Sequence, residues 1–397
     1  MQVVKRDGSI VLFDRSKIIA AIEKANASVE ESDRISDDQI LEIAKSIENK
    51  RRNRLLVEDI QDMVESRLMA LDRYALAKSY IIYRYNRALV RKQNTTDESI
   101  LSLLHNTNKE LAEENSNKNT VIASTQRDYI AGEVSRDLTR RILLPEHISK
   151  AHDEGTIHFH DADYFIQPIF NCCLINIGDM LDNGTMINGK LIESPKSFQV
   201  ACNVMTQIIA NVASNQYGGQ SVDISHLGKY LRKSYEKFKK KIVAECEGEY
   251  ISESLIEKLT QERLREELKS GVQTIQYQIN TLMTTNGQSP FVTLFLYLKD
   301  GDPYIEENAM IIEEVLRQRL EGIKNAAGVY VTPAFPKLVY VLDENNCLRG
   351  GKYDYITRLA VKCSAKRMYP DYISAKKMRE YKQGDVYPCM GCRSFLT

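Results

Sequence analysis

Three apolar runs of strand length, separated by amphipathic stretches, constrain the fold of this chain more than any other feature. The runs are FNCCLINI at 170–177, PFVTLFLYL at 290–298 and PKLVYVL at 336–342. Between them, residues 196–216 and 311–326 carry apolar side chains at helical spacing. Strands that are apolar along their whole length are buried on both faces, as in sheets covered by helices. The pattern therefore predicts an α/β sheet or barrel.

The N-terminal part of the chain has a different pattern. Residues 2–12 predict a β-hairpin that turns at Asp7-Gly8. Amphipathic helices are predicted after the hairpin at 14–25, 36–50 and 57–71. These short elements predict a small α+β domain.

Polar and charged stretches set the limits of the domains. Residues 93–120 are polar and predict a linker around one short helix. The chain then divides into an α+β domain at 1–92 and an α/β domain at 121–397. The charged stretch 227–271 predicts a pair of solvated helices. Acidic residues interrupt its basic ones and aromatic residues do not alternate with them, which argues against a nucleic-acid surface.

Composition excludes several classes of partner. Lys plus Arg and Asp plus Glu both number 54, so no overall positive field attracts nucleic acid or an anionic membrane. No apolar run has the length of a membrane helix or the form of a signal peptide. Eight irregularly spaced cysteines among 397 residues do not suit a disulfide scaffold. The expected location is the cytoplasm.

Cationic residues surround the predicted N-terminal turn. Lys5 and Arg6 precede a glycine that lets the backbone approach a phosphate, and Lys17 lies one turn into the next helix. Taken alone, K-R-D-G is an ordinary polar hairpin turn. Together with VEDIQDMVESRL and YALAKSYIIYRYNRA, however, the segment resembles the ATP-cone, a nucleotide-sensing module. The resemblance implies that Lys5, Arg6 and Lys17 bind the phosphates of ATP or dATP, with Arg87 as a weaker candidate.

An ATP-cone also occurs in a transcription regulator of deoxynucleotide synthesis. In that regulator a cysteine-bearing zinc ribbon precedes the cone, whereas the first cysteine of this chain is Cys172. A DNA-binding function is therefore disfavoured.

Seven ordered motifs in the second domain point to another family. They are HFHDADYF, FNCCLINIGDML, QIIANVASNQYGGQSV, NTLMTTNGQSPFVTL, FPKLVYVL, AKRMYPD and CMGCRSFL. In this order they resemble anaerobic, class III ribonucleoside-triphosphate reductase, a glycyl radical enzyme. The resemblance implies part of a ten-stranded α/β barrel built from two antiparallel half-barrels. It also implies ribonucleoside triphosphate substrates, dNTP effectors, a homodimer and a radical-SAM activating enzyme.

Two cysteines correspond to the sulfurs that the family's chemistry requires. The resemblance assigns the thiyl radical to Cys392, on a loop where Gly391 permits a tight turn. It assigns the reducing thiol to Cys172 on the facing strand. Arg393 and Ser394 then supply hydrogen-bond donors near the substrate.

Neighbouring cysteines leave alternatives open. Cys173 adjoins Cys172, and on a strand only one of the two can face the cavity. Such a cysteine pair also occurs in the pyruvate formate-lyase branch, but there it lies on the radical loop, so acyl transfer is disfavoured. The family pattern does not need Cys389, which is interpreted as loop packing or a back-up thiol. A zinc half-site of Cys389 and Cys392 would need a second ligand pair, and the sequence has no further C-x-x-C.

Other polar residues complete the expected substrate site. By resemblance, His158 and His160 line the substrate end of the barrel; on a strand they would share one face, but a metal is not expected there. Asn286, Gln288 and Ser289 lie in a turn that is either a nucleotide contact or only the entry to a strand. QIIANVASNQYGGQ, at 207–220, is expected near a dimer interface that binds effectors, and its glycine pair is compatible with a helix C-cap.

The family's remaining parts are expected outside this sequence. They are a glycyl radical loop and two cysteine pairs that hold zinc, so the chain is expected to be an inactive fragment or half of a split enzyme. The reductant, formate or a thioredoxin-type protein, stays open. The alternative function is a non-catalytic nucleotide sensor that keeps the cone and a partial barrel.

Overall fold

The computed structural model divides into two compact units, residues 1–99 and 100–397. The structure describes residues 2–4, 10–50, 54–105, 107, 119–167, 169–246, 252–284, 287–384 and 386–391, without the side chains of 87–98. Several predicted site residues lie outside this description: Lys5, Arg6, Asn286, Cys392, Arg393, Ser394 and the side chain of Arg87. Among the described residues, no helix is both long and apolar enough to cross a membrane.

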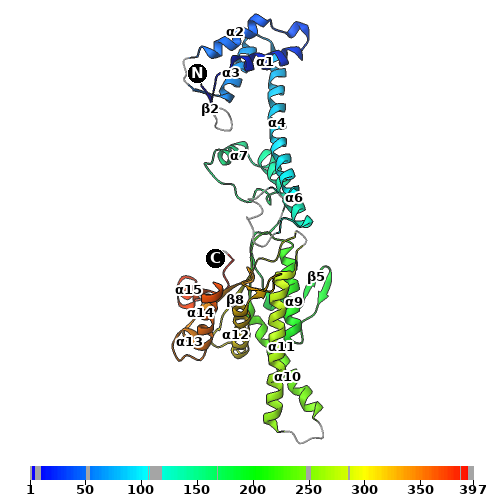
Figure 1. Ribbon diagram of the computed structural model, residues 1–397, viewed down its shortest axis with the longest axis vertical. Coiled ribbons are helices and arrows are strands. Elements are labelled where there is room, and N and C mark those ends of the chain that lie inside the picture. The colour runs from blue at the N-terminus through cyan, green and yellow to red at the C-terminus, as the bar shows by residue number, and fades with distance from the viewer. Residues whose placement is uncertain are drawn as a thin grey trace. The chain divides into compact units, whose positions relative to one another are not determined.

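The first unit is a small sheet packed with helices, as predicted (Figure 1). Strands β1 (Gln2–Val4) and β2 (Ile10–Leu12) form the expected antiparallel hairpin. A third strand, β3 (Arg54–Leu56), pairs parallel to β1 and was not predicted, because three residues carry too little pattern. The predicted helices are α1 (Arg15–Ala27), α2 (Asp37–Glu48) and α3 (Val57–Ala70). The unit has its own apolar core, which includes Ile22, Ile40, Val64 and Leu68.

Helix α4 (Tyr74–Leu104) continues through the first part of the expected linker. The polar composition suggested a linker around one short helix, but no glycine or proline interrupts residues 74–104. At its start, α4 is joined to α3 by Arg84, which pairs with Glu58, Asp62 and Glu65. The limits of the linker remain a proposal.

The second unit contains a five-stranded sheet with the order β12-β11-β8-β7-β4, and every neighbouring pair is parallel. The strands are β4 (Cys173–Leu174), β7 (Gln220–Asp223), β8 (Val292–Leu296), β11 (Lys337–Leu342) and β12 (Asp371–Ser374). Five parallel strands connected through helices are what one half of a ten-stranded α/β barrel contains. The predicted fold class, a partial α/β barrel behind a small α+β domain, is confirmed.

The strands differ in length from the apolar runs that predicted them. β8 and β11 fill most of theirs, whereas β4 has two residues because Asn176 already caps α8 (Ile177–Asp182). β7 and β12 were not predicted, since each is short and mixes polar with apolar residues. The glycine pair Gly218-Gly219 is not the helix C-cap considered above: α9 (Phe198–Ala213) ends at Ser214, and the glycines lead into β7.

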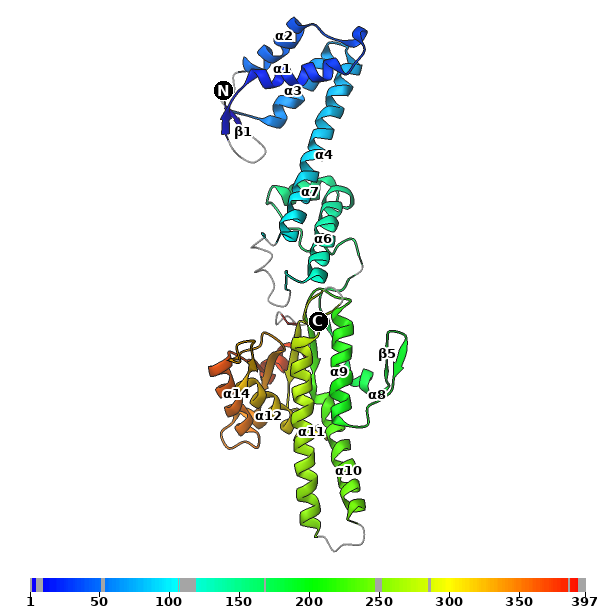
Figure 2. The same ribbon diagram turned by 45° about the vertical axis from the view of Figure 1, so that its right-hand side comes forward.

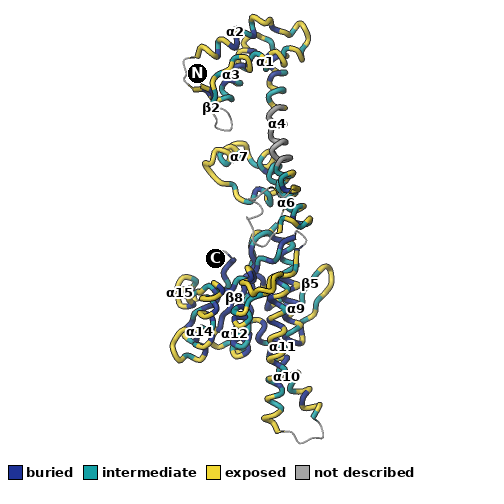
Figure 3. The backbone as a smooth tube through the Cα atoms, viewed as in Figure 1, coloured by how far each residue is buried: buried dark blue, intermediate teal, exposed yellow. Residues whose placement is uncertain are grey.

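Helices α9, α10 (Gly228–Glu245), α11 (Glu253–Thr281), α12 (Ile305–Glu321) and α14 (Asp354–Arg367) pack around the main core. In Figure 2, α11 runs alongside both α9 and α10. α10 and α11 occupy the charged stretch that was expected to form solvated helices, but both also bury residues in the main core, such as Leu231 and Leu268. Their far ends are exposed, whereas buried residues concentrate near the sheet (Figure 3).

The opposite face of the sheet carries a smaller cluster, here called the interior cluster. Its members are Phe295, Tyr297, Val339, Val341, Ala375 and Cys389. Alternate residues of β8, such as Leu294 and Leu296, belong to the main core instead. The segment 386–391 and α15 (Ala375–Tyr381) therefore cover the face that does not contact α9–α12.

Shorter elements complete the second unit. They are α6 (Ala123–Leu138), the π-helical turn η2 (Thr139–Leu143), α7 (Glu146–Asp153), β5 (Thr185–Ile187), β6 (Lys190–Ile192), η3 (Ile224–Leu227), β9 (Ile323–Lys324), β10 (Tyr330–Val331) and α13 (Glu344–Cys347). In the first unit, η1 spans Glu31–Asp33.

Candidate active site

A cavity of about 680 Å³ lies at the amino ends of the parallel strands. Each of four neighbouring strands contributes one residue to its wall, at or directly before the strand's first position. These residues are Cys172, Gly219, Phe291 and Lys337. Gly391 lines the same cavity. The sheet thus gathers residues distant in sequence at one edge.

The two adjacent cysteines have different surroundings. Cys172 lines the cavity, and its Sγ accepts a hydrogen bond from the Gly219 amide at 3.2 Å. Cys173 packs against the main core, and its thiol donates to Oε1 of Gln216 at 3.0 Å. Burial, and next the neighbouring Cys172, raise the pKa of Cys173 to about 11. Among the described cysteines, Cys172 is the one in the cavity wall.

Glycines let the segment 386–391 approach the sheet. A Cβ added to Gly219 would lie 2.5 Å from the Phe291 ring, and one added to Gly391 would lie 2.7 Å from the same ring. Both positions therefore require the absence of a side chain. The added Cβ of Gly219 would also lie 3.7 Å from the Cα of Gly391, so Cys172 and the residue before Cys392 are parts of one compact wall.

The residues near the predicted radical cysteine are packed rather than free. Cys389 is fully buried in the interior cluster, and its carbonyl accepts a 2.6 Å hydrogen bond from the Ser221 hydroxyl. This location agrees with its interpretation as loop packing.

The two predicted histidines lie together in the cavity wall. Nε2 of His158 is 3.1 Å from Nδ1 of His160, and Nε2 of His160 is 3.2 Å from Oδ1 of Asp161. The expected strand is wrong: the pair lies in a turn-rich loop, where Asp161 has a positive φ of 55°. A turn rather than strand alternation thus brings the two rings within hydrogen-bond distance, and the tautomers decide which ring donates.

Tyr217 is a cavity residue that the sequence did not reveal. Its hydroxyl donates to Oδ2 of Asp161 at 3.0 Å, and its ring stacks on Tyr164 with centroids 4.0 Å apart. Burial, together with the hydrogen bond to Asp161, raises its pKa to about 12. Tyr217 is therefore a neutral donor at physiological pH.

Three cations in the wall were also missed. Arg136 lies 2.8 Å from Glu133, Arg140 pairs with Asp153, and the Lys337 ammonium is 4.5 Å from the centroid of Phe291. They come from α6, η2 and β11, which only the tertiary fold brings together. Arg136 also lies 4.0 Å from Asp163, and Asp161 and Asp163 line the same cavity, so the wall combines cations with carboxylates.

The predicted turn at 285–291 is described only from Gly287. Gln288 lines the cavity but is buried, and its amide reaches the carbonyls of Ala213 and Gln216 at 3.4 and 3.3 Å. Gly287 has a φ of +74°, and its carbonyl accepts from the Thr125 hydroxyl at 2.9 Å. Ser289 is half-buried and is not among the lining residues.

Residues that could hold a cofactor lie in the first unit. Lys17 borders a mainly apolar cavity of about 170 Å³ whose wall includes Val3, Ile18, Ile60 and Tyr80. The exposed ammonium of Lys17 beside this wall suits a ligand with both a flat apolar part and anionic groups. Among the described residues, no group of three or more His, Cys, Asp or Glu could hold a metal ion.

Family models match most of the chain. A model described as "Anaerobic ribonucleoside-triphosphate reductase" matches residues 114–397, and one described as "ATP cone domain" matches residues 1–89.

Curated relatives match nearly the whole chain. An anaerobic ribonucleoside-triphosphate reductase of Haemophilus influenzae is 37% identical over 99% of this chain and 55% of its own length. The Escherichia coli protein of the same name is 37% identical over 99% of this chain and 54% of its own length. The chain therefore spans about half the length of the curated relatives it matches.

Solved structures of anaerobic ribonucleotide reductase are also similar. One from Thermotoga maritima, with dATP bound in the specificity site, has a TM-score of 0.45 and 12% identity. The match covers 69% of this chain and 45% of that one.

Proposed function

Because the chain belongs to the family of anaerobic ribonucleoside-triphosphate reductases, we propose that it provides the regulatory unit and half of the catalytic barrel for reducing ribonucleoside triphosphates to deoxyribonucleoside triphosphates. One observation supports this most directly: Cys172 and Gly391, the residue before Cys392, line the same cavity. Ribonucleotide reduction needs two sulfurs within reach of one ribose. The cavity offers one in its wall and the segment that leads to the other.

In the proposed mechanism, Cys392 as a thiyl radical removes the 3′-hydrogen of the ribose. An S–H bond forms as the C–H bond breaks, and the 2′-hydroxyl takes the proton of the 3′-hydroxyl and leaves as water. The Cys172 thiol then gives a hydrogen atom to the resulting radical. The reductant, formate or a thioredoxin-type protein, supplies the two electrons and two protons that restore this thiol and reduce the 3′-ketone, and Cys392 returns its hydrogen atom to C3′. A glycyl radical, made by a radical-SAM activating enzyme, provides the unpaired electron in this family.

The remaining wall residues bind and orient the substrate. We assign this role to His158, His160 and Gln288 in the cavity, and to Asn286, Ser289, Arg393 and Ser394 from the motifs. The cationic side chains of Arg136, Arg140 and Lys337 suit a triphosphate, because they face the same space. Tyr217 holds Asp161 beside His160 and so orients that imidazole.

The first unit is proposed to bind the effectors ATP and dATP. Lys17 borders an apolar cavity there, and Lys5, Arg6 and Arg87 are the further phosphate ligands proposed. A dNTP that selects the substrate, a homodimer, zinc bound outside this chain and a cytoplasmic location belong to the same proposal.

A reconstituted assay tests the activity. The chain is combined with a polypeptide that supplies the rest of the relatives' length, and is activated anaerobically by a radical-SAM enzyme. With CTP and ATP we expect dCTP. Cys392→Ser should form none and keep its radical signal, because an alkoxyl radical is too energetic to be generated. Cys172→Ser should lose the signal when substrate is added, because the substrate radical is left without a reducing thiol.

The alternative function, a non-catalytic nucleotide sensor, makes the opposite forecast. It expects ATP binding without dCTP in every preparation. Turnover that survives Cys392→Ser would refute the proposed mechanism. ATP binding without dCTP, in a reconstituted sample that carries the radical signal, would favour the sensor.

A further inference from the structure

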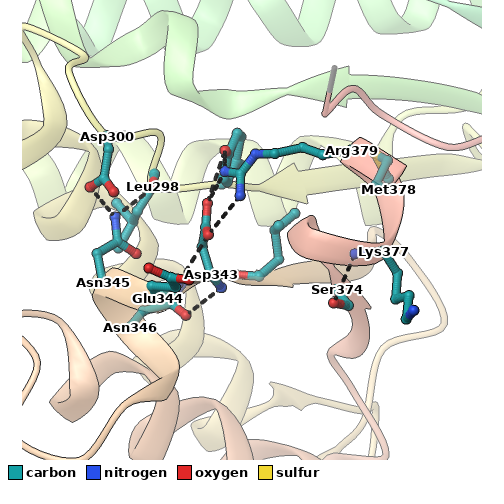
Figure 4. Close-up of polar contacts among 12 residues, drawn as sticks. Leu298, Asp300, Asp343, Glu344, Asn345, Asn346, Ser374, Lys377, Met378 and Arg379 are labelled. Atoms are coloured by element: carbon teal, nitrogen blue, oxygen red, sulfur yellow. Dashed lines mark hydrogen bonds and ion pairs between the residues drawn. The ribbon is translucent and has the colours of Figure 1, made fainter. Parts of the chain in front are cut away.

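A cluster at the carboxyl ends of the strands joins three elements around one guanidinium. Arg379 of α15 donates to Oδ1 of Asp343 at 3.1 Å and forms an ion pair with Oδ2 of the same carboxylate. Nη2, the nitrogen of this ion pair, also donates to the hydroxyl of Tyr297 at 3.0 Å, and that hydroxyl donates to Oδ2 of Asp343 at 3.1 Å. Asp343 follows β11 and Tyr297 follows β8, so the cluster joins α15 to two strand ends (Figure 4).

The carboxylate of Asp343 is buried and held in place by its hydrogen bonds. The Asp343 side chain is 4% exposed and caps α13 through a capping box with Asn346. Burial is the largest single effect and opposes its ionisation, but the hydrogen bonds from Arg379, the Glu344 amide and Tyr297, with the charge of Arg379, together hold its pKa below the usual value. A buried carboxylate held by a two-point guanidinium contact fixes the guanidinium in turn.

Helix α15 contacts the segment that leads to Cys392. The Tyr387 amide donates to the sulfur of Met378, which precedes Arg379, at 3.3 Å. Val386 and Cys389 pack on the interior cluster, which also contains Ala375 of α15. The position of α15 therefore determines where this segment lies.

The strand β7 holds the same segment from the other side. The hydroxyl of Ser221 donates to the Cys389 carbonyl at 2.6 Å, and both residues are buried. This carbonyl lies three positions before Cys392 in the sequence.

From these contacts we infer that Arg379 and Ser221 are positioning residues, which fix the segment 386–391 and thereby the approach of Cys392 to the cavity. The inference rests on the proposed role of Cys392. Hydrogen-atom transfer depends steeply on the separation of the reacting atoms, so a loop with a reactive sulfur needs such anchoring. The Arg379 contacts lie at the opposite end of the strands from the cavity, so their effect must pass through the segment.

Cysteine reactivity tests the anchoring without any enzymatic activity. The reduced 397-residue chain is treated with iodoacetamide, and the modification rate of each cysteine is followed by peptide mass spectrometry. Loss of a charge-assisted hydrogen bond, or of a neutral one that leaves a buried carbonyl without its partner, costs about 1–3 kcal/mol and shifts local opening by roughly tenfold. We therefore expect Arg379→Met and Ser221→Ala each to speed modification of buried Cys389 by about tenfold.

Matched substitutions and cysteines serve as controls. Lys377→Met changes an exposed ion pair with Glu380 on the same helix, and Ser364→Ala removes a comparable hydroxyl–carbonyl bond to Pro370. Neither should alter Cys389. Cys202 and Cys363, which are fully buried in the main core, should stay protected in all four variants, because the change is local. Unchanged Cys389 reactivity in both Arg379→Met and Ser221→Ala would overturn the anchoring.

Kinetics in the reconstituted enzyme test the positioning role itself. Arg379→Met should lower kcat about tenfold or more and leave KM within about twofold, because the residues that bind the substrate are unchanged. Unchanged kcat with an exposed Cys389 would overturn the positioning role. If the wild-type enzyme forms no product, the proposed function fails, whereas the cysteine experiment still decides whether the anchors exist.

Discussion

Cys172 and Cys173 show how one peptide bond separates two chemical environments. Cys172 lies in the cavity wall, whereas Cys173 packs against the main core and donates to Gln216. The sequence showed that only one of them can face the cavity, and the paired strands β4 and β7 decide which. The role of Cys172 as the reducing thiol remains a proposal.

The two thiols should react at different rates. Because burial raises the pKa of Cys173 to about 11, about a thousandth of this thiol is ionised at pH 8. We expect iodoacetamide to modify Cys172 at least about tenfold faster than Cys173, measured by mass spectrometry of the folded chain. In denaturant the two rates should converge. Faster modification of Cys173 in the folded chain would contradict its placement against the core.

Lys17 offers a second test at the scale of single residues. Its ammonium borders the cavity of the first unit, so Lys17→Ala should weaken ATP and dATP binding about tenfold, the value of one charge-assisted phosphate contact. Calorimetry on the full chain measures this. Lys24→Ala is a suitable control because Lys24 is exposed on the same helix and is not among the residues that line the cavity. Equal affinities in the wild type and the Lys17 variant would remove Lys17 from the phosphate site.

At the scale of elements, helices were predicted better than strands. The amphipathic period of α1, α2 and α3 extends over several turns, and α2 also begins with a capping box between Ser36 and Gln39. Strands β7 and β12 have four residues each, so their alternation is too brief to detect. Their pairing with β8 and β11, not their own sequence, determines that they are strands.

The sequence predicted only those cavity residues to which the family resemblance assigned a role. His158, Gln288 and Cys172 came from the family resemblance and line the wall. Tyr217 and Lys337 lie within the motifs QIIANVASNQYGGQSV and FPKLVYVL, but the resemblance gave neither of them a role in the cavity. Their place in the wall depends on how β7, β11 and the loop at 158–164 assemble. Tertiary neighbours of this sort cannot be obtained from a single sequence without an alignment.

Helix packing predicts that a glycine-to-alanine substitution changes the free energy of unfolding in opposite directions at two helix positions. A Cβ on Gly271 of α11 would lie 2.5 Å from the Phe198 ring of α9, whereas one on Gly132 of α6 would meet Asp163 at an ordinary 3.5 Å. We expect Gly271→Ala to lower the free energy of unfolding by about 1–3 kcal/mol through overpacking. Gly132→Ala should raise it by about 0.4–1 kcal/mol, because alanine restricts the unfolded chain.

Urea unfolding followed by circular dichroism measures both values, with the wild type as the reference. A stabilising effect of Gly271→Ala would show that α9 and α11 can move apart to accept the methyl group without a loss of unfolding free energy. A destabilising effect of Gly132→Ala would show that the contact with Asp163 is tighter than the structure gives.

At the scale of the whole molecule, the described residues of the two units form separate main apolar cores. One includes Ile22 and belongs to residues 1–99, and the other includes Ile312 and belongs to residues 100–397. Each core is closed by its own sheet and helices, which is the physical basis of independent unfolding. The proposed effector site lies in the first unit and the proposed active site in the second.

We therefore expect scanning calorimetry of the full chain to show two unfolding transitions. ATP should raise the midpoint temperature of only the transition that belongs to residues 1–99. At a hundred times its dissociation constant, a ligand stabilises the unit that binds it by about 2.7 kcal/mol. Substitutions in each core assign the transitions to the units. Ile22→Ala should lower the midpoint temperature of the ATP-sensitive transition and Ile312→Ala that of the other, because each removes about 2–5 kcal/mol from the unfolding free energy of its unit. Lys17→Ala should reduce the ATP shift and leave both transitions of the free chain in place. A single transition that both isoleucine variants lower equally would mean that the units unfold together, and an ATP shift confined to the transition lowered by Ile312→Ala would place the nucleotide in the second unit.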